Sequence, residues 1–193
     1  MSNSIVPVVA TREAVSRPDN CAGYRRFLMR VLGGVVAALL ITLCAFYVFN
    51  WHTNKSPSFP RGIYRLIERS PASGELVFFA PPDAEIFREA QVRGYFKRGD
   101  YLLKKLVATS GDVVTIDATG VTVNGHRLPN SQPRAFDGAG RPLQAAVLRD
   151  YRLAGGEVLL MSDYSPQSWD ARYFGVQNEA GITGAARPVW LWD

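Results

Sequence analysis

The hydrophobic and polar positions divide the chain into one long apolar run and a series of short alternating segments. The run covers residues 31–49, VLGGVVAALLITLCAFYVF, and contains no charged residue and no proline. A helix of this length rises roughly 28 Å at ~1.5 Å per residue, close to the ~30 Å thickness of a bilayer's hydrocarbon core. The run therefore predicts one transmembrane helix over residues 31–49.

The rest of the chain has the alternation and turn signals that are typical of short strands. We expect strands over residues 62–67, 75–79, 101–107, 113–116, 121–123, 157–161 and 189–192. Two prolines and an acidic start predict one short helix within residues 81–93, and a segment rich in Pro, Gly and Arg over residues 129–156 predicts a long connection. The predicted fold is mainly β: an antiparallel domain with one short helix, on a single N-terminal transmembrane helix.

Basic residues precede the apolar run and predict its orientation. Residues 1–30 hold five basic and two acidic side chains, namely Arg12, Arg17, Arg25, Arg26, Arg30, Glu13 and Asp19. The positive-inside rule then keeps the N-terminus in the cytoplasm and exports the part of the chain after the run. We expect a cytoplasmic basic tail over residues 1–30, a transmembrane helix over residues 31–49 and an exported domain over residues 50–193.

Two other interpretations of the apolar run remain open. A cleaved signal peptide would have an unusually long basic region of about thirty residues, and no convincing Ala-x-Ala site follows the run. A lipoprotein would use Cys44, but Leu43 precedes it where a small residue is expected. Both features favour a retained anchor.

Composition narrows the chemistry of the exported domain. After residue 30 the chain has 17 basic and 15 acidic residues of the 22 and 17 in the whole sequence, so we expect no nucleic-acid partner. Cys21 and Cys44 both precede the domain, which predicts no disulfide in it. His52 and His126 lie far apart in the sequence, so we expect no metal site, no cofactor and no Ser-His-Asp triad.

A serine activated by a neutral lysine remains a possible nucleophile. In YLLKKLVATSGD, residues 101–112, Lys104 and Lys105 stand among aliphatic residues of a predicted strand. Alternation along the strand points the two ammonium groups to opposite faces, so one can be buried and lose its charge. A pair of solvated lysines at a sheet edge is the alternative. The pattern alone does not choose between the two lysines.

Three stretches in this order resemble the conserved boxes of the type I signal peptidase family: SPSFPRGIYR, LLKKLVATSGDVVTIDATGVTVNGHRLPNS and LLMSDYSPQSWDARYFG. The resemblance is strongest to the conjugative-transfer branch, the TraF-type pilin-maturation serine peptidases. It covers nearly all of the exported domain and implies a signal-peptidase-like fold. It also implies an inner-membrane protein whose N-terminus is cytoplasmic and whose catalytic domain is periplasmic. The last box lacks the usual Gly-Asp-Asn-Arg start, which argues against a housekeeping signal peptidase.

The family's serine/lysine dyad carries over to particular residues of this chain. The resemblance implies that Ser58 is the nucleophile, that Lys104 is the general base, and that Ser56 and the Ser58 amide form the oxyanion hole. The Ser-x-Asp-x-Arg box places supporting residues at Ser168, Asp170 and Arg172, where a charged Asp-Arg fork can fix geometry.

The resemblance implies a membrane-anchored serine endopeptidase that cleaves, and in one alternative cyclises, an exported pilin precursor for conjugative transfer. The expected partners are the pilin-like substrate, the inner membrane and the transfer apparatus. A general type I signal peptidase is one alternative. A non-catalytic structural component of a transfer or secretion apparatus is another.

Overall fold

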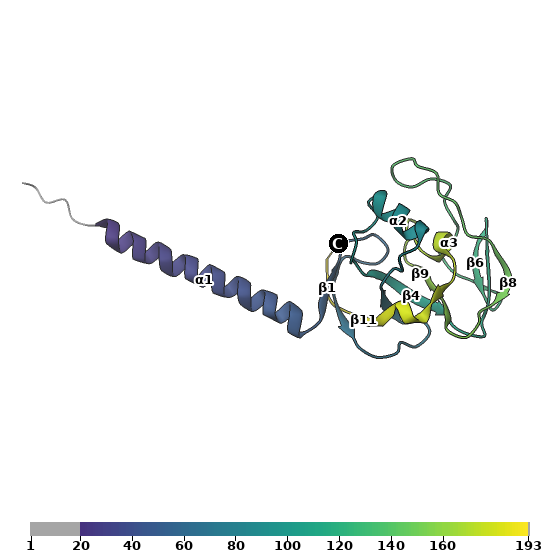
Figure 1. Cartoon of the computed structure of the whole chain (residues 1–193), viewed down its shortest axis with the longest axis horizontal. Coiled ribbons are helices and arrows are strands. Elements are labelled where there is room, and N and C mark those ends of the chain that lie inside the picture. The colour runs from purple at the N-terminus through teal and green to yellow at the C-terminus, as the bar shows by residue number, and fades with distance from the viewer. Residues whose placement is uncertain (1–19, 193) are drawn as a thin grey trace, which may run out of the picture. The chain divides into compact units, whose positions relative to one another are not determined.

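The computed structural model describes residues 20–192, and the side chains of residues 23–192 (Figure 1). The chain divides into two compact units, one ending at Cys44 and the other, here called the β domain, beginning at Ala45. The predictions for Arg12, Arg17 and the side chain of Cys21 lie outside these described residues.

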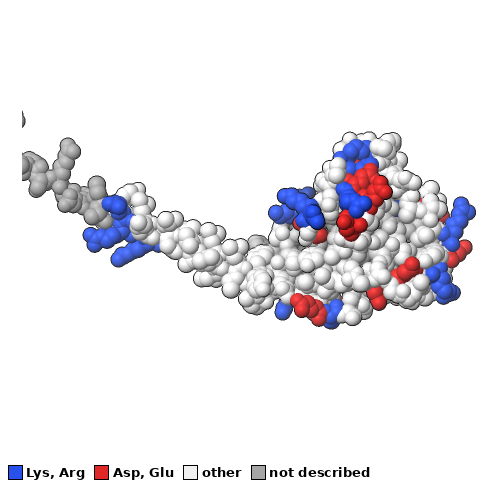
Figure 2. Space-filling model, viewed as in Figure 1, with Lys and Arg blue, Asp and Glu red and all other residues white. Residues whose placement is uncertain are grey.

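Helix α1, Asn20–Val48, contains the apolar run. Its segment from Gly23 to Val48 is long enough to cross a membrane, and an 18-residue window within it has a mean hydropathy of 2.5. Figure 2 shows basic residues near the start of the helix and an uncharged stretch after them. The expected N-terminal apolar helix is therefore confirmed. The limits of the membrane segment and its orientation remain predictions.

Seven strands of the β domain form one antiparallel sheet in the order β1-β2-β11-β3-β4-β9-β10 (Figure 1). The strands are β1 Trp51–Asn54, β2 Gly62–Ile67, β3 Leu76–Phe79, β4 Leu102–Ala108, β9 Glu157–Met161, β10 Gln177–Asn178 and β11 Ile182–Leu191. Since β4 lies between β3 and β9, both of its edges are paired and its side chains project alternately to the two faces of the sheet. This position determines how its lysines are presented.

A second antiparallel sheet has the order β7-β6-β5-β8. Its strands are β5 Val113–Asp117, β6 Gly120–Val123, β7 His126–Arg127 and β8 Leu148–Arg152. The hairpin signals explain its first turns. Asp117 caps the turn to β6 by accepting the amide of Thr119 at 2.7 Å, and Asn124-Gly125 has the positive φ angles of 50° and 79° that a tight turn needs.

Three helical segments complete the β domain: α2 Glu85–Val92, α3 Ala171–Phe174 and the 3₁₀ turn η1 Glu179–Gly181. Helix α2 buries Phe87 and Ala90, which are three residues apart and therefore share one face. Phe87, Phe174 and Trp169 pack with ring centroids 5.1–5.5 Å apart, which attaches both helices to the core.

The predicted fold, mainly β with antiparallel pairing, is confirmed. The bounds predicted for residues 62–67 and 157–161 match β2 and β9. Strands β1, β7 and β10 were not predicted, and other local predictions differ. The connection over residues 129–156 contains β8, the segment predicted over 189–192 is the end of the longer β11, and α3 adds one helical turn beyond the single helix expected. Strand β8 is exposed at four of its five positions, and β11 has a buried run followed by an exposed run, so neither strand alternates clearly. Helix α3 is a buried turn of four residues, which is too short to show a helical period.

The core lies around the larger sheet in two clusters of buried side chains. The larger cluster joins both sheets and includes Val77, Leu106, Val114, Ile116, Leu159 and Leu160. The smaller one consists of Phe59, Tyr64, Phe78, Leu103 and Ala186, and it lies beside the segment that carries Ser58. Phe59 is 6% exposed, so burial of this ring holds the backbone next to Ser58.

Candidate active site

Ser58 lies in the segment between β1 and β2, and the side chain of Asn54 closes that segment into a compact turn. The Asn54 amide nitrogen donates to the carbonyls of Phe59 and Pro60, both at 3.1 Å. Its amide oxygen accepts the backbone N–H of Ser56 at 3.2 Å and the Ser56 hydroxyl at 2.8 Å. A buried amide with several bonds fixes the turn. The sequence analysis did not single out Asn54, since a polar residue next to a turn is common.

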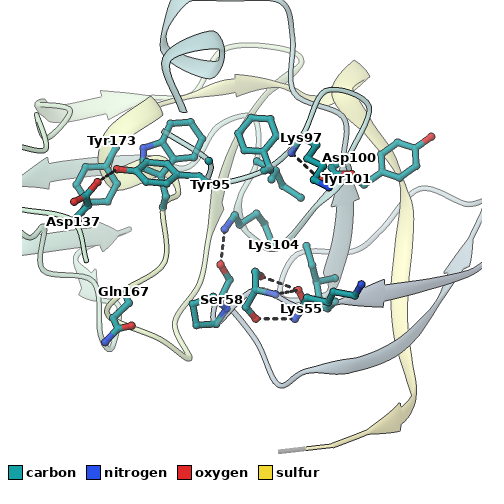
Figure 3. Close-up of a pocket in the computed structure, with 18 of the residues that line it drawn as sticks. Lys55, Ser58, Tyr95, Lys97, Asp100, Tyr101, Lys104, Asp137, Gln167 and Tyr173 are labelled. Carbon is teal, nitrogen blue, oxygen red and sulfur yellow. Dashed lines mark hydrogen bonds between the residues drawn. The ribbon is translucent and has the colours of Figure 1, made fainter. Parts of the chain in front are cut away.

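Lys104 meets Ser58 across the domain, although 46 positions separate the two residues in the sequence. The Lys104 Nζ donates to Ser58 Oγ at 3.0 Å and to Ser168 Oγ at 2.9 Å. The Ser168 hydroxyl donates in turn to Ser58 Oγ at 3.0 Å. The structure thus brings three of the predicted residues into one hydrogen-bonded triangle, and Figure 3 shows Ser58 and Lys104 pointing toward each other.

The surroundings of Lys104 disfavour its charged form. The side chain lies in the interior with a residue exposure of 3%, and Ser58 beside it is 5% exposed. Burial lowers the pKa of Lys104 to about 8 from an ordinary 10.5; the charge of Asp170 opposes the shift and that of Arg172 adds to it. A lysine with this pKa is partly neutral near pH 7 and can accept a proton.

Lys105 occupies a different environment. It lies on the opposite face of β4 and forms an ion pair with Asp163, with Nζ and Oδ2 2.6 Å apart. Side-chain exposures of 31% and 22% leave this pair in contact with water. The sequence left the choice between the two lysines open, and the structure places Lys104 beside Ser58.

Asp170 and Arg172 form a fully buried ion pair behind the triangle. The Arg172 Nη2 lies 2.7 Å from Asp170 Oδ2, and both side chains have an exposure of 0%. Arg172 also donates to the backbone carbonyls of Asn130, Ser165 and Ser168 at 2.7–3.1 Å. Since one of those carbonyls belongs to Ser168, the arginine holds the loop that delivers this hydroxyl to Lys104.

Ser162 connects Asp170 to the backbone of Ser58, and no pattern in the sequence indicated it. Its amide donates to Asp170 Oδ2 at 3.0 Å, and its hydroxyl donates to the carbonyl oxygen of Ser58. The same hydroxyl accepts the amide of Ser165 at 3.2 Å. Ser162 has 0% exposure, so each of these bonds lies in the interior. The ion pair therefore reaches Ser58 through Ser162 and reaches Lys104 through Ser168.

Ser56 is half-buried on the same cleft as Ser58. Its hydroxyl donates to Asn54 Oδ1 at 2.8 Å, so an oxyanion contact would require this hydroxyl to turn away from Asn54. The oxyanion role assigned to Ser56 and the Ser58 amide stays a prediction.

A cleft of about 1080 Å³ in the β domain opens onto Ser58 and Lys104. Small-molecule pockets measure ~300–1,000 Å³, so this cleft is large enough for a peptide segment. Figure 3 shows Tyr95, Asp137 and Tyr173 gathered at one end of it and Lys97, Asp100 and Tyr101 at the other. Among residues 20–192, no group of three or more His, Cys, Asp or Glu side chains is arranged to hold a metal ion.

Comparison with known proteins assigns the chain to a family. Residues 24–192 match the signal peptidase family, peptidase S26. The chain belongs to this signal peptidase family. Two plasmid transfer proteins TraF from Escherichia coli are 38% identical over 176 residues, covering 86% of this chain and 99% of the relative, and 39% identical over 175 residues, covering 88% and 98%. The resemblance to the TraF branch, drawn from the three sequence boxes, is thereby confirmed.

Other relatives of this signal peptidase family member are more distant. A probable conjugal transfer protein TraF from Sinorhizobium fredii is 36% identical over 174 residues, covering 84% of this chain and 88% of the relative. A crystal structure of a signal peptidase I from Enterococcus faecalis aligns with a TM-score of 0.37 and 20% identity over 62% of this chain and 98% of that one. Family membership supports a serine peptidase at the level of the family.

Proposed function

We propose that this protein is a membrane-anchored serine endopeptidase that uses Ser58 as the nucleophile and Lys104 as the general base. The observation that carries the proposal is the 3.0 Å separation of Lys104 Nζ and Ser58 Oγ, at a buried position that lowers the pKa of Lys104. A nucleophile and its base within hydrogen-bond reach are the expected arrangement for acyl transfer.

In the proposed reaction, neutral Lys104 takes the proton of the Ser58 hydroxyl while Oγ attacks the carbonyl carbon of a small substrate residue, the residue that precedes the cleaved bond. The resulting oxyanion is stabilised by the Ser58 amide and the Ser56 hydroxyl, at roughly 3 kcal/mol per donor. Collapse of this intermediate breaks the peptide bond, and the leaving amine takes the proton from Lys104. Ser58 is left as an ester of the substrate.

Two nucleophiles can release the ester. A water molecule, deprotonated by Lys104, gives a linear shortened product and restores both residues. The substrate's own N-terminal amine gives a ring closed by a new peptide bond. Relatives named as plasmid and conjugal transfer proteins support an association with a transfer apparatus, and we propose that the substrate is an exported pilin-like subunit of it.

The anchor supports the same proposal. Ser58 lies nine residues beyond the end of the apolar run. A helix that spans the inner membrane would therefore present Ser58 near the periplasmic surface of that membrane. We propose that residues 1–30 are cytoplasmic, residues 31–49 cross the membrane and residues 50–193 lie in the periplasm. Substrates that cross the same membrane would reach the cleft there.

The decisive experiment is intact-mass analysis of the cognate pilin-like precursor co-expressed with wild type, Ser58→Ala, Lys104→Ala and Lys105→Ala. We expect a shortened product with wild type and Lys105→Ala, and intact precursor with the other two. A product one water lighter than the linear form demonstrates ring closure. Processing by Ser58→Ala, in a host that leaves the precursor intact without the protein, contradicts the assigned nucleophile.

Two alternatives predict different outcomes. A general signal peptidase would also process unrelated exported precursors in the same cells, which proteome-wide analysis of mature N-termini detects. A non-catalytic structural component would leave every precursor intact, and Ser58→Ala would support conjugative transfer as well as wild type does. The close contact of Ser58, Lys104 and Ser168 favours the enzyme over this structural role.

A further inference from the structure

A small hairpin over residues 134–143, here called the wall hairpin, forms one side of the cleft. Its backbone is paired by an isolated bridge between Phe136 and Pro142 and by the bond from the Leu143 amide to the Ala135 carbonyl at 2.8 Å. Arg134, Phe136, Asp137, Gly138 and Leu143 line the cleft. The hairpin lies within residues 129–156, which the sequence pattern predicted to be a long connection. None of its residues belongs to the proposed dyad or its supporting network.

Asp137 organises the tip of the wall hairpin. Its Oδ1 accepts the amides of Ala139 and Arg141, both at 2.9 Å. Its Oδ2 accepts the Tyr95 hydroxyl at 2.6 Å and Arg141 Nε at 2.7 Å. The Asp137 side chain is 7% exposed, and the Tyr95 hydroxyl and Arg141 hold its pKa well below its usual range. A carboxylate with four donors is a rigid junction, because each donor restricts the same two oxygens.

The same junction attaches the wall hairpin to the segment that follows α2. Arg141 Nη2 donates to the carbonyl of Arg93 at 3.0 Å, and Arg93 Nη1 donates back to the carbonyl of Pro142 at 2.8 Å. The Arg141 guanidinium also lies over the Tyr95 ring, 5.5 Å from its centroid. Figure 3 shows Tyr95 and Asp137 side by side at the edge of the cleft.

The base of the wall hairpin is attached beside the proposed catalytic network. The Arg134 amide donates to the Tyr173 hydroxyl at 3.0 Å, and the Ala146 amide donates to the carbonyl of Arg172 at 2.8 Å. The hairpin is therefore held at its tip and on both sides of its base. Such a hairpin is a fixed wall, and its shape is set before a substrate arrives.

The wall hairpin presents an apolar surface to the cleft. Phe136 is 57% exposed although it is a large aromatic residue. Tyr95, Phe96, Trp169 and Tyr173 line the same cleft. Aromatic surfaces in a concave site favour an apolar side chain, because its burial removes apolar surface from water.

We propose that the wall hairpin is a specificity element of the cleft: Phe136 contributes to an apolar subsite for a bulky apolar side chain of the substrate, and Asp137 is the residue that positions it. The proposal rests on the peptidase function proposed above. It adds to that function a substrate preference at a position other than the small residue before the cleaved bond.

The test uses binding to the full-length protein in detergent, in a Ser58→Ala background that prevents turnover. The probes are fluorescent peptides of Ala, Ser and Gln in which a single Phe is moved along the chain, each compared with the peptide that has Ser at that position. We expect one Phe position to improve affinity about tenfold, as burial of a large apolar group predicts. Phe136→Ser and Asp137→Asn should each abolish that preference and leave the affinity for the Ser peptides unchanged.

Control variants distinguish the positioning of Phe136 by Asp137 from a general loss of structure. Tyr95→Phe removes a single bond to Asp137 and should weaken the preference partially. Asp83→Asn makes the same chemical change in an exposed ion pair with Arg88, away from the residues that line the cleft, and should keep the full preference. In the Ser58-containing protein, Asp137→Asn should raise KM for the preferred Phe peptide without changing kcat, which a general loss of structure would not produce.

Each outcome decides between the two proposals. A Phe preference that Phe136→Ser leaves intact overturns the wall hairpin as a specificity element, even where wild type cleaves its substrate. A preference that depends on Phe136, in a protein that cleaves no peptide, supports the subsite and contradicts the peptidase function. Equal affinity for every Phe and Ser peptide also overturns the subsite.

Discussion

Lys104 and Lys105 are neighbours in β4 that project to opposite faces of the sheet. Lys104 lies 3.0 Å from the Ser58 hydroxyl in the interior, and Lys105 lies 2.6 Å from a carboxylate oxygen of Asp163 at a partly exposed position. Two identical side chains therefore have different chemistry because of strand alternation and burial alone. Both the activity and the stability of the β domain should depend on this difference.

The first prediction concerns the dependence of activity on pH. A general base must be neutral, so kcat/KM should rise about tenfold per pH unit below the pKa of Lys104 and level off above about 8. At pH 7 about 10% of the enzyme would then have a neutral lysine, compared with less than ~0.1% for an ordinary lysine. A pH–rate profile of the purified protein measures the midpoint. A midpoint near 10.5 would contradict the role of burial.

The second prediction concerns stability and reverses the usual effect of a core substitution. Lys104→Met removes an amine whose charged form is destabilised by burial. The free energy of unfolding at pH 7 should therefore rise by up to about 3 kcal/mol, at ~1.4 kcal/mol for each unit by which burial lowers the pKa.

The sign follows from proton binding. Between about pH 8 and 10.5 the unfolded chain holds a proton on Lys104 that the folded protein lacks, so wild-type stability rises with pH over this range. The advantage of Lys104→Met should therefore shrink over the same range. Denaturant unfolding of wild type and Lys104→Met at several pH values measures this.

The third prediction concerns Ser162. Ser162→Ala removes the bond to the Ser58 carbonyl and leaves the buried amide of Ser165 without its partner, which costs ~1–3 kcal/mol of stability. We expect kcat to fall about tenfold with KM unchanged, because Ser58 loses its orientation while the cleft keeps its shape. Ser162→Thr keeps the hydroxyl and should retain more activity. A fall in stability with unchanged kcat would limit Ser162 to a structural role.

The fourth prediction concerns the buried ion pair. Asp170→Asn leaves the charge of Arg172 buried without its counterion, and the free energy of unfolding should fall by ~3–5 kcal/mol. Asp163→Asn, which breaks the partly exposed pair with Lys105, should cost less than ~1 kcal/mol. Equal losses in the two variants, measured by denaturant unfolding, would show that Asp170 does not brace the site.

The sequence by itself determined seven of the eleven strands that residues 20–192 form, and the candidate chemistry. Alternation placed β2 and a short apolar run placed β9 with the correct bounds, because β2 buries one face more than the other and β9 is buried along almost its whole length. The resemblance of the three stretches that contain Ser58, Lys104 and the Ser-x-Asp-x-Arg box indicated the family, which the match over residues 24–192 then showed. The roles proposed for these residues remain predictions.

Only the tertiary structure decided which side chains meet. The choice of Lys104 over Lys105 depends on which face of β4 is covered, and the turn that carries Ser58, closed by Asn54, lies against the Lys104 side chain. Ser162 and Asp137 could not be singled out, since a serine or an aspartate in a loop is ordinary until its partners are known. Those partners lie up to 104 positions away in the sequence, and long-range contacts of this kind are created by packing, which no local pattern records.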